Sequence, residues 1–179
     1  MIRLFTALSV PDAVAEALAR RQTGLPAAKW RTADQLHITL TFYGEIDERR
    51  ADDLSVELER ATAGGPFELA LAGAGGFGDG HRTQTLWAGV EANERLSVLA
   101  GRCRSAAERA SIQIERRDYR PHLTLAYLKP QADPDRIGAW ISDHNLLRSP
   151  PIRVDRFGLY SSVLSQDGSR YELEREYRL

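Results

Sequence analysis

The amino-acid sequence predicts an α+β fold of two similar lobes, with two antiparallel sheets flanking a central cleft and helices on the outside. Segments that alternate apolar and polar residues take turns with segments of helical periodicity, a pattern typical of this class. The tetrad His-x-Thr-Leu opens two of the strand-like segments, at His37 and His122. The two histidines lie 85 residues apart (122 − 37 = 85), which indicates an internal repeat.

Each element follows from a local pattern. An apolar run ends at Pro11, and apolar residues alternate with polar ones around each tetrad, which favours strands. Leu54 and Leu58, four residues apart among charged residues, indicate a surface helix, and similar periodicity indicates the other helices. The predicted strands cover residues 3–10, 36–43, 67–71, 85–90, 121–128, 152–160 and 170–177. The predicted helices cover residues 12–21, 47–63, 94–110 and 133–144.

The offset of 85 residues maps one half of this outline onto the other. It carries Phe67 onto Ile152 and Leu86 onto Tyr171, strand onto strand, although residue identity outside the tetrads is low. We therefore expect residues 1–179 to form a single domain of two pseudo-symmetric lobes, with the tetrads facing each other across the pseudo-axis. The alternative is that two unrelated strands happen to contain histidine.

Two segments are predicted to be connections. The Asp167-Gly168 pair is typical of a two-residue hairpin turn between the last two strands. The glycine-rich run from Gly73 to Gly80 lacks the GK[ST] and G-x-G-x-x-G patterns of phosphate-binding loops. It predicts a flexible connection that closes over a ligand.

The overall composition excludes several classes of protein. Hydrophobic residues make up 42% of the chain and charged residues 27%, which indicates a folded domain rather than a disordered one. The formal net charge of −1 provides no basic excess for binding long nucleic acids, so we expect contact only with an RNA end, an oligonucleotide or a nucleotide.

The single cysteine and the N-terminus indicate the compartment. Cys103 cannot form an internal disulfide, and apolar neighbours at helical spacing predict that it is buried. The apolar N-terminal stretch stops at Pro11, too early for a membrane span, and lacks the features of a secretory signal. We expect a cytoplasmic monomer with no membrane partner.

Strand periodicity assigns the tetrad side chains to faces. In the first copy the polar face is expected to hold Gln35, His37, Thr39, Thr41 and Tyr43, and the core face Leu36, Ile38, Leu40 and Phe42. In the second copy the polar face is expected to hold Arg120, His122, Thr124 and Ala126, and the core face Pro121, Leu123, Leu125 and Tyr127.

This arrangement suits phosphoryl chemistry. A histidine titrates near pH 6.5, so one member of a facing pair can accept a proton while the other donates one. Thr39 and Thr124 can donate hydrogen bonds to the non-bridging oxygens of a phosphate as charge develops there. Arg120 can add a fixed positive charge, and Tyr43 can stack on a base. The alternatives to these roles are that Arg120 forms an ion pair with a neighbouring acidic residue and that Tyr43 only marks the end of the strand.

Other residues have weaker signals. His81-Arg82-Thr83 is a third His-x-Thr, but it follows glycines and lacks the leucine, so we place it on the surface or at the rim of the substrate site. His144 is expected on the surface of a helix, and Trp30 and Trp87 in the core or between the lobes. The sequence contains neither a cysteine cluster nor a His-x-His motif, so it gives no indication of a zinc site, and no cofactor is expected.

The chain resembles the two-histidine phosphoesterase superfamily, and within it the RNA 2′,3′-cyclic phosphodiesterases, also called 2′-5′ RNA ligases. The resemblance covers nearly the whole length. It is carried by the segments RLFTAL, KWRTADQLHITLTFYGEI, TLWAGV, RDYRPHLTLAYLK and FGLYSSVLSQDGSRYELEREYRL.

The resemblance implies metal-independent hydrolysis of an RNA or nucleotide 2′,3′-cyclic phosphate to a 2′-phosphomonoester, possible in reverse as 2′-5′ ligation. It makes His37 the proton donor to the leaving 3′-oxygen and His122 the acceptor from water, with Thr39 and Thr124 binding phosphate. The partners would be RNA 3′ ends, oligonucleotides or nucleotides that carry the cyclic phosphate.

The chain departs from the family pattern at two places. Thr83-Gln84-Thr85 stands where the family often has Pro-Arg-Val, which puts a basic contact from that loop in doubt. Tyr127 stands where arginine is common, and strand parity points it away from the histidine. The alternatives are a related activity on 2′-5′ linkages or ADP-ribose cyclic phosphate, a non-catalytic module that binds RNA ends, and a metal hydrolase.

Overall fold

The computed structural model describes residues 1–79, 81–115, 117–165 and 168–179. The strands are β1 (Ile2–Ser9), β2 (Ala28–Trp30), β3 (His37–Ile46), β4 (Phe67–Leu69), β5 (Leu71–Gly78), β6 (Thr83–Val90), β7 (His122–Leu128), β8 (Ile152–Val154), β9 (Arg156–Ser165) and β10 (Gly168–Arg178). The helices are α1 (Asp12–Ala19), α2 (Glu48–Glu57), α3 (Glu94–Arg109) and α4 (Pro134–Asp143), with 3₁₀ turns η1 (Ala33–Gln35) and η2 (Leu58–Gly64).

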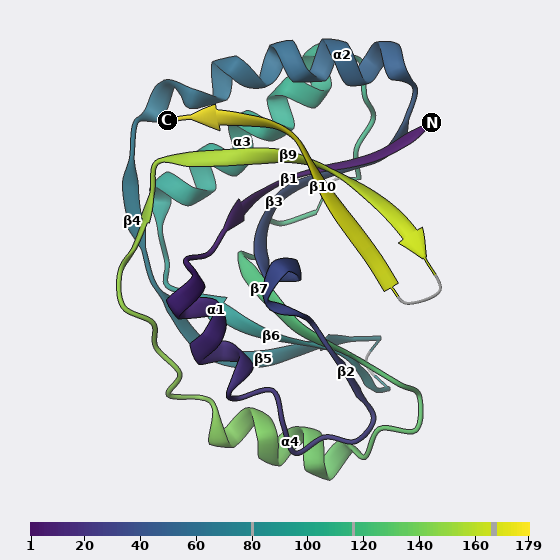
Figure 1. The fold of residues 1–179 in the computed structure, drawn as a ribbon, viewed down its shortest axis with the longest axis vertical. Coiled ribbons are helices and arrows are strands. Elements are labelled where there is room, and N and C mark those ends of the chain that lie inside the picture. Colours follow the sequence, from purple (N-terminus) through teal and green to yellow (C-terminus); the bar gives the residue numbers. More distant parts are fainter. Residues whose placement is uncertain (80, 116, 166–167) are drawn as a thin grey trace.

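Eight strands form one antiparallel sheet in the order β10-β9-β1-β3-β7-β6-β5, with β2 paired to β7 beside this path. β3 and β7 pair through a single residue each, Ile38 and Leu123. This pair divides the sheet into a first wing (β10, β9, β1, β3) and a second wing (β7, β6, β5, β2), above and below the crossing in Figure 1. β4 and β8 form a separate two-stranded sheet.

The helices cover the outside of the wings. α2 and α3 pack on β1 and β3 of the first wing, and α4 packs on β5 of the second (Figure 1). Asp47, Asn93 and Asp133 cap the last three helices, each accepting a backbone N–H of its first turn. All four predicted helices are confirmed, although the second ends as α2 at Glu57 and continues as η2. Across the described residues, no helix has the length and apolar character needed to cross a membrane.

Several sequence expectations need correction. Two separate sheets were expected, whereas the tetrad strands meet edge to edge for one pair and join the wings into one sheet. β2 was missed because three residues are too few to display an alternation. The segment 152–160 is two strands, broken at Asp155. The hairpin turn predicted at Asp167-Gly168 involves residues 166–167, which lie outside the described residues.

The glycine-rich run is a strand up to Gly78 rather than a flexible connection. It is β5, paired with β6, and its glycines let neighbouring groups approach closely. A Cβ at Gly75 would lie 2.4 Å from the Trp87 ring, so glycine is required there by packing.

A small hydrogen-bonded cluster is buried between β1, β3 and α3. The hydroxyls of Thr6 and Tyr43 lie 3.1 Å apart, and the Tyr43 hydroxyl donates to the carbonyl of Cys103 at 3.3 Å. Cys103 is fully buried, as predicted, and burial raises the pKa of its thiol to about 12. The polar groups satisfy one another inside an otherwise apolar core.

Gly89, which pairs with His122, provides a test of this close packing. A Cβ at Gly89 would lie 2.4 Å from the carbonyl oxygen of Ala72. We expect Gly89→Ala to lower the free energy of unfolding by about 1–3 kcal/mol, measured by urea denaturation, because backbone must move. Gly138→Ala in α4 is the control, because a Cβ there meets nothing within 4 Å. This variant should raise the free energy of unfolding by up to about 1 kcal/mol, since alanine favours a helix over glycine. Equal stability of Gly89→Ala and the wild type would contradict the packing argument.

Candidate active site

The two tetrads meet where β3 and β7 cross. Ile38 and Leu123 pair at the crossing and point into the core, 1% and 0% exposed. Their neighbours along the strands are the polar tetrad residues, His37, Thr39, His122 and Thr124. Because side chains alternate along a strand, all four point to the face opposite the core. The antiparallel register sets each histidine across from the threonine of the other tetrad.

The two histidines are held in the same way. His37 Nδ1 lies 2.8 Å from the carbonyl oxygen of Gln35, and His122 Nδ1 lies 2.6 Å from that of Arg120. A carbonyl oxygen only accepts, so each Nδ1 carries a proton and donates it to the residue two positions before. Neither Nε2 has a hydrogen-bond partner in the described part of the chain. Each ring therefore presents Nε2 for proton transfer.

Aromatic rings lie beside both imidazoles, and they bury the His37 ring. The His37 ring centroid lies 5.1 Å from that of Phe5 and 5.1 Å from that of Tyr171, which meets it edge-on. Burial lowers the pKa of His37 from 6.5 to about 4, against the opposing bond to the Gln35 carbonyl. Electrostatic interactions with Arg31 and His122 lower this pKa further. His37 is therefore neutral at pH 7 before any ligand binds.

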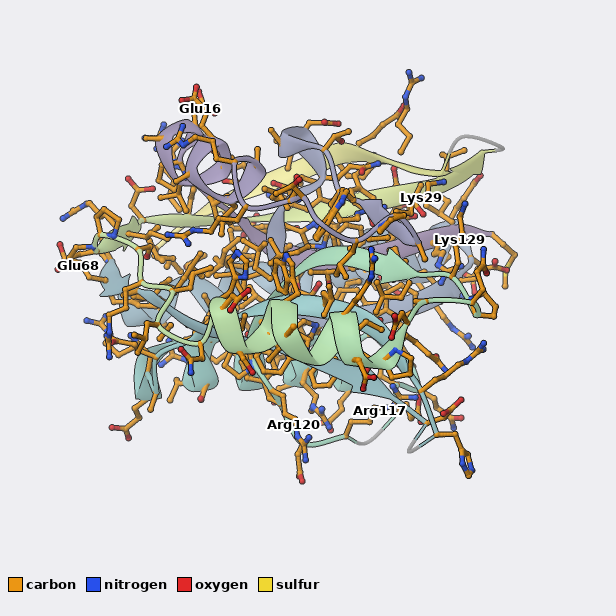
Figure 2. The ribbon with its side chains drawn as sticks, turned by 90° about the horizontal axis from the view of Figure 1, so that it is seen from below. Glu16, Lys29, Glu68, Arg117, Arg120 and Lys129 are labelled. Carbon is orange, nitrogen blue, oxygen red and sulfur yellow. The ribbon has the colours of Figure 1, made fainter. Side chains whose placement is uncertain are left out.

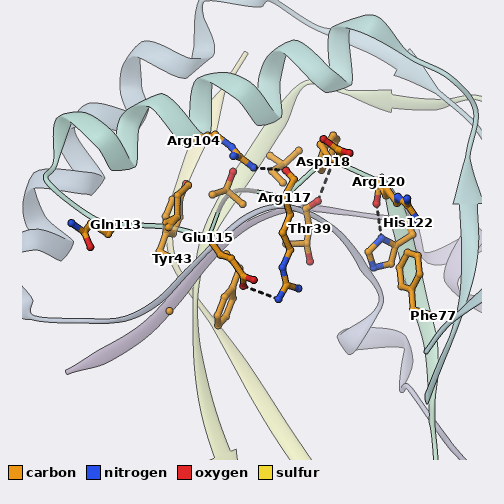
Figure 3. A pocket seen from close by; sticks show the side chains of 16 residues that line it. Thr39, Tyr43, Phe77, Arg104, Gln113, Glu115, Arg117, Asp118, Arg120 and His122 are labelled. Carbon is orange, nitrogen blue, oxygen red and sulfur yellow. Dashed lines mark hydrogen bonds and ion pairs between the residues drawn. The ribbon is translucent and has the colours of Figure 1, made fainter. Parts of the chain in front are cut away.

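A cavity of about 890 Å³ opens beside the crossing (Figure 3). Thr39 and His122 line it, together with Phe42, Phe77 and Arg120, whereas His37 and Thr124 do not. The His122 ring meets Phe77 edge-on, with centroids 4.8 Å apart. The structure thus places two of the four tetrad residues in the cavity and brings the other two to the same face of the crossing. Two further predicted site residues, Arg120 and Tyr43, also border the cavity.

Arginines form one wall of this cavity. Arg117 pairs with Glu115 at 2.7 Å and accepts a hydrogen bond from Arg104 on its carbonyl (Figure 3). Arg117 and Arg120 lie on the same side of the molecule in Figure 2. Arg120 is exposed, and no described carboxylate lies within ion-pair distance of it. Its charge is available to an anion, and its backbone carbonyl orients His122.

The expected assignment of side chains to faces is wrong beyond the tetrads, because both strands contain β-bulges. Thr6 pairs with Thr41 and Ala7 with Thr39, which leaves Leu40 unpaired. The extra residue in a bulge turns every later side chain of that strand to the opposite face of the sheet. Tyr43 is therefore buried, 4% exposed, although it borders the cavity. This burial does not favour stacking of a base on its ring, and its role in substrate binding stays a prediction.

The second strand has the same irregularity at the equivalent place. Leu86 pairs with Ala126 and Trp87 with Thr124, which leaves Leu125 unpaired. Tyr127, expected in the core, is 47% exposed on the histidine face. A second expected core residue, Phe42, is likewise 48% exposed.

Each of these exposed rings lies beneath a guanidinium group. Arg3 lies over Phe42 at 5.0 Å from its centroid, and Arg31 lies over Tyr127 at 5.4 Å. Sequence reasoning missed all four residues. The aromatic residue five positions after each tetrad histidine was the available signal, since Phe42 and Tyr127 are related by the repeat offset (127 − 42 = 85).

The remaining candidates lie away from the crossing. His81 is exposed, and its backbone N–H donates to Asp79 at 3.0 Å. His144 ends α4 with its ring stacked on Trp140 at 4.1 Å, half-buried rather than on the surface. Trp30 packs against Trp140, and Trp87 lies beside His122 at 6.4 Å. Among the described residues, no three His, Cys, Asp or Glu side chains gather in a way that could hold a metal ion.

Chemically, the crossing combines two imidazole bases, two hydroxyl donors and nearby guanidinium groups on one face. These are the groups needed to bind a phosphate and to move protons on both sides of it.

Comparisons with known proteins agree with this interpretation of the fold. The RNA 2′,3′-cyclic phosphodiesterase of Thermotoga maritima is 31% identical over 96% of this chain and 92% of its own length. That of Methanothermobacter thermautotrophicus is 28% identical over 99% of each chain.

Solved structures share the architecture over almost the whole length. The protein TT0787 of Thermus thermophilus has a TM-score of 0.82 and 27% identity, covering 99% of this chain and 98% of its own. Escherichia coli LigT complexed with 3′-AMP has a TM-score of 0.77 and 26% identity, again covering 99% and 98%. The model of the 2′-5′ RNA ligase superfamily matches residues 10–165. The chain belongs to the 2′-5′ RNA ligase superfamily.

Proposed function

We propose that the protein hydrolyses a 2′,3′-cyclic phosphate at an RNA 3′ end or on a nucleotide to a 2′-phosphomonoester, using His37 and His122 and no metal. One observation carries the proposal: the crossing at Ile38 and Leu123 puts both histidines on one face, and neither Nε2 has a hydrogen-bond partner among the described residues. The names of relatives at 25–31% identity over nearly the full chain support the substrate class.

The proposed reaction is an in-line displacement at phosphorus. Water attacks phosphorus as one imidazole Nε2 takes its proton, and the bond from phosphorus to the 3′-oxygen breaks as the other imidazole protonates that oxygen. Thr39 and Thr124 donate hydrogen bonds to the non-bridging oxygens, whose charge rises in the transition state. Arg120 faces the same cavity as a positive charge for the phosphate chain.

The exposed Phe42 ring is our proposed site for the nucleoside. It borders the same cavity as Thr39 and is 48% exposed even though Arg3 lies over the ring, so we propose that a base stacks on the part of the ring that Arg3 leaves open. This role replaces the one expected for Tyr43. Nucleotide ligands are also favoured by E. coli LigT, which has been crystallised with ATP, 3′-AMP, NADP+ and phosphate.

We propose His37 as the proton donor and His122 as the acceptor, following the family resemblance. The low pKa of His37 leaves its imidazole neutral at pH 7 in the free protein, whereas a proton donor must be protonated when the reaction begins. A bound phosphodiester carries a negative charge and raises the pKa of an adjacent imidazole. In our proposal the bound substrate therefore raises the pKa of His37, so that its imidazole is protonated in the complex.

We further propose that residues 1–179 are one domain of two lobes related by a pseudo-two-fold axis, with the active site in the cleft between them. The offset of 85 residues supports this, since it relates Ile38 to its own partner Leu123. It relates the unpaired Leu40 to the unpaired Leu125 in the same way. An equal spacing of matched irregularities is expected of a duplicated unit.

The first test is turnover itself. An oligoribonucleotide with a terminal 2′,3′-cyclic phosphate should yield a 2′-monoester in EDTA, identified by phosphorus NMR. His37→Ala and His122→Ala should each lower kcat by about 10²–10⁴-fold, the usual contribution of a positioned acid or base. His81→Ala, the third His-x-Thr histidine, is the matched control and should keep wild-type activity. Turnover that requires added metal, or full activity of either tetrad variant, would refute the proposal.

The direction of proton transfer has its own test. A substrate with sulfur in place of the bridging 3′-oxygen has a leaving group that needs no protonation, because a thiolate is a much weaker base than an alkoxide. We expect the thio substrate to restore most of the activity of His37→Ala and to leave His122→Ala inactive. The released thiol is measured with a chromogenic disulfide. Rescue of His122→Ala instead would reverse the assignment.

The pKa of His37 provides a further prediction. We expect its imidazole resonances, assigned with His37→Ala, to titrate near pH 4 in the free protein. A folded pKa below the unfolded value of about 6.5 means that stability is complete above pH 6.5 and falls as the pH drops towards 4. Saturating inorganic phosphate should move the midpoint upward. A midpoint near 6.5 in the free protein would contradict the desolvation of this ring.

A further inference from the structure

Arg31 is a buried cation next to the crossing, and the proposed reaction gives it no role. It lies between β2 and η1, and its backbone N–H donates to the carbonyl of Leu125 at 2.8 Å. The residue is 5% exposed. Arginine is rarely buried to this degree unless a partner compensates its charge.

The contacts of the guanidinium group are aromatic and neutral. Nη2 donates to the Tyr171 hydroxyl at 2.8 Å. The Arg31 Cζ atom lies 5.4 Å from the ring centroid of Tyr127 and 5.5 Å from that of Tyr171. No carboxylate among the described residues lies within ion-pair distance of Arg31. Two aromatic faces and one hydroxyl favour a cation but do not neutralise it.

Tyr171 connects this cation to His37. One side of the tyrosine meets the His37 ring edge-on at 5.1 Å, and its hydroxyl holds Arg31. The titratable and charged groups that face His37 are Arg31 from the loop after β2, His122 from β7 and Tyr171 from β10. A charge held in such apolar surroundings acts strongly on its neighbours, because little water screens it.

We propose that Arg31 is a positioning residue whose uncompensated charge holds the anionic phosphate group of the substrate beside His37. The inference rests on the proposed function for the identity of the substrate, but the anion site itself does not. Tyr127 and Tyr171 fix the direction of the guanidinium group, and the phosphate supplies the negative charge that this part of the chain lacks. Arg31 thus serves the His37 side of the crossing as Arg120 serves the His122 side.

A purely structural role for Arg31 makes different predictions. If the guanidinium group only joins Tyr171 to β7, its loss lowers the melting temperature and leaves phosphate affinity unchanged. If it positions the anion, its loss weakens phosphate binding and raises KM more than it lowers kcat. Loss of the guanidinium group also moves the titration midpoint of His37 upward, because a nearby positive charge has been removed.

The test measures inorganic phosphate binding by calorimetry, which requires no turnover. Arg31→Gln keeps an amide donor for Tyr171 but removes the charge, and we expect phosphate to bind at least about ten-fold more weakly, as for a lost charge-assisted bond. Arg31→Lys restores the charge and should recover part of the affinity and return the His37 midpoint towards its wild-type value. Arg170 is an exposed arginine next to Tyr171, so Arg170→Gln is the matched control. It should change neither the phosphate affinity nor the titration midpoint of His37.

Each outcome decides the inference. Wild-type phosphate affinity in a folded Arg31→Gln overturns it, as does a wild-type protein that binds no phosphate at millimolar concentration. If Arg31→Gln does not fold, ¹⁵N spectra of the wild type replace it: phosphate should shift the Arg31 Nε–H resonance and not that of Arg170. Arg31-dependent phosphate binding without turnover of the cyclic phosphate would uphold the anion site and refute the proposed function.

Discussion

One residue pair, Ile38 with Leu123, joins the two wings of the sheet, and the site depends on it. Both side chains are buried at the crossing, and the described residues of β3 and β7 form no further pair. The same burial turns the histidines and threonines on either side outward. A slip of one residue in either strand would place Ile38 or Leu123 in the site and bury a histidine. Hydrophobic packing therefore specifies which groups would meet the phosphate in the proposed reaction.

The bulges at Leu40 and Leu125 then determine what surrounds the tetrads. Without them, Phe42 and Tyr127 would extend the core. With them, each ring comes to the outer face, where a guanidinium group covers it. The two sides of the crossing differ in exposure: the Phe42 side opens into the large cavity, whereas Arg31 is nearly closed off. This asymmetry suits a reaction in which the two histidines perform opposite tasks.

The sequence predicted the parts of the fold that depend on local patterns. All four helices and both tetrad strands could be located, because apolar periodicity is a local signal. The pairing of the tetrads followed from their offset. The alternation alone did not predict the fates of Tyr43, Phe42 and Tyr127, since a bulge depends on the partner strand; the aromatic residues at matched positions were the only signal of it in the sequence. Gly75 was misread for a similar reason: its packing partner, Trp87, lies on the neighbouring strand. Burial of Arg31 likewise depends on β7 and β10, far away in the sequence.

The buried cluster behind β3 has a practical consequence. Cys103 is the sole cysteine of the chain, and its thiol, with a pKa of about 12, is almost entirely protonated inside the core. Only the thiolate reacts with alkylating reagents, so labelling must wait for the helix α3 to separate from β1 and β3. The rate of labelling then reports how often this half of the core opens, without any engineered probe. The protein carries its own sensor of fluctuations in the layer that supports the crossing of β3 and β7.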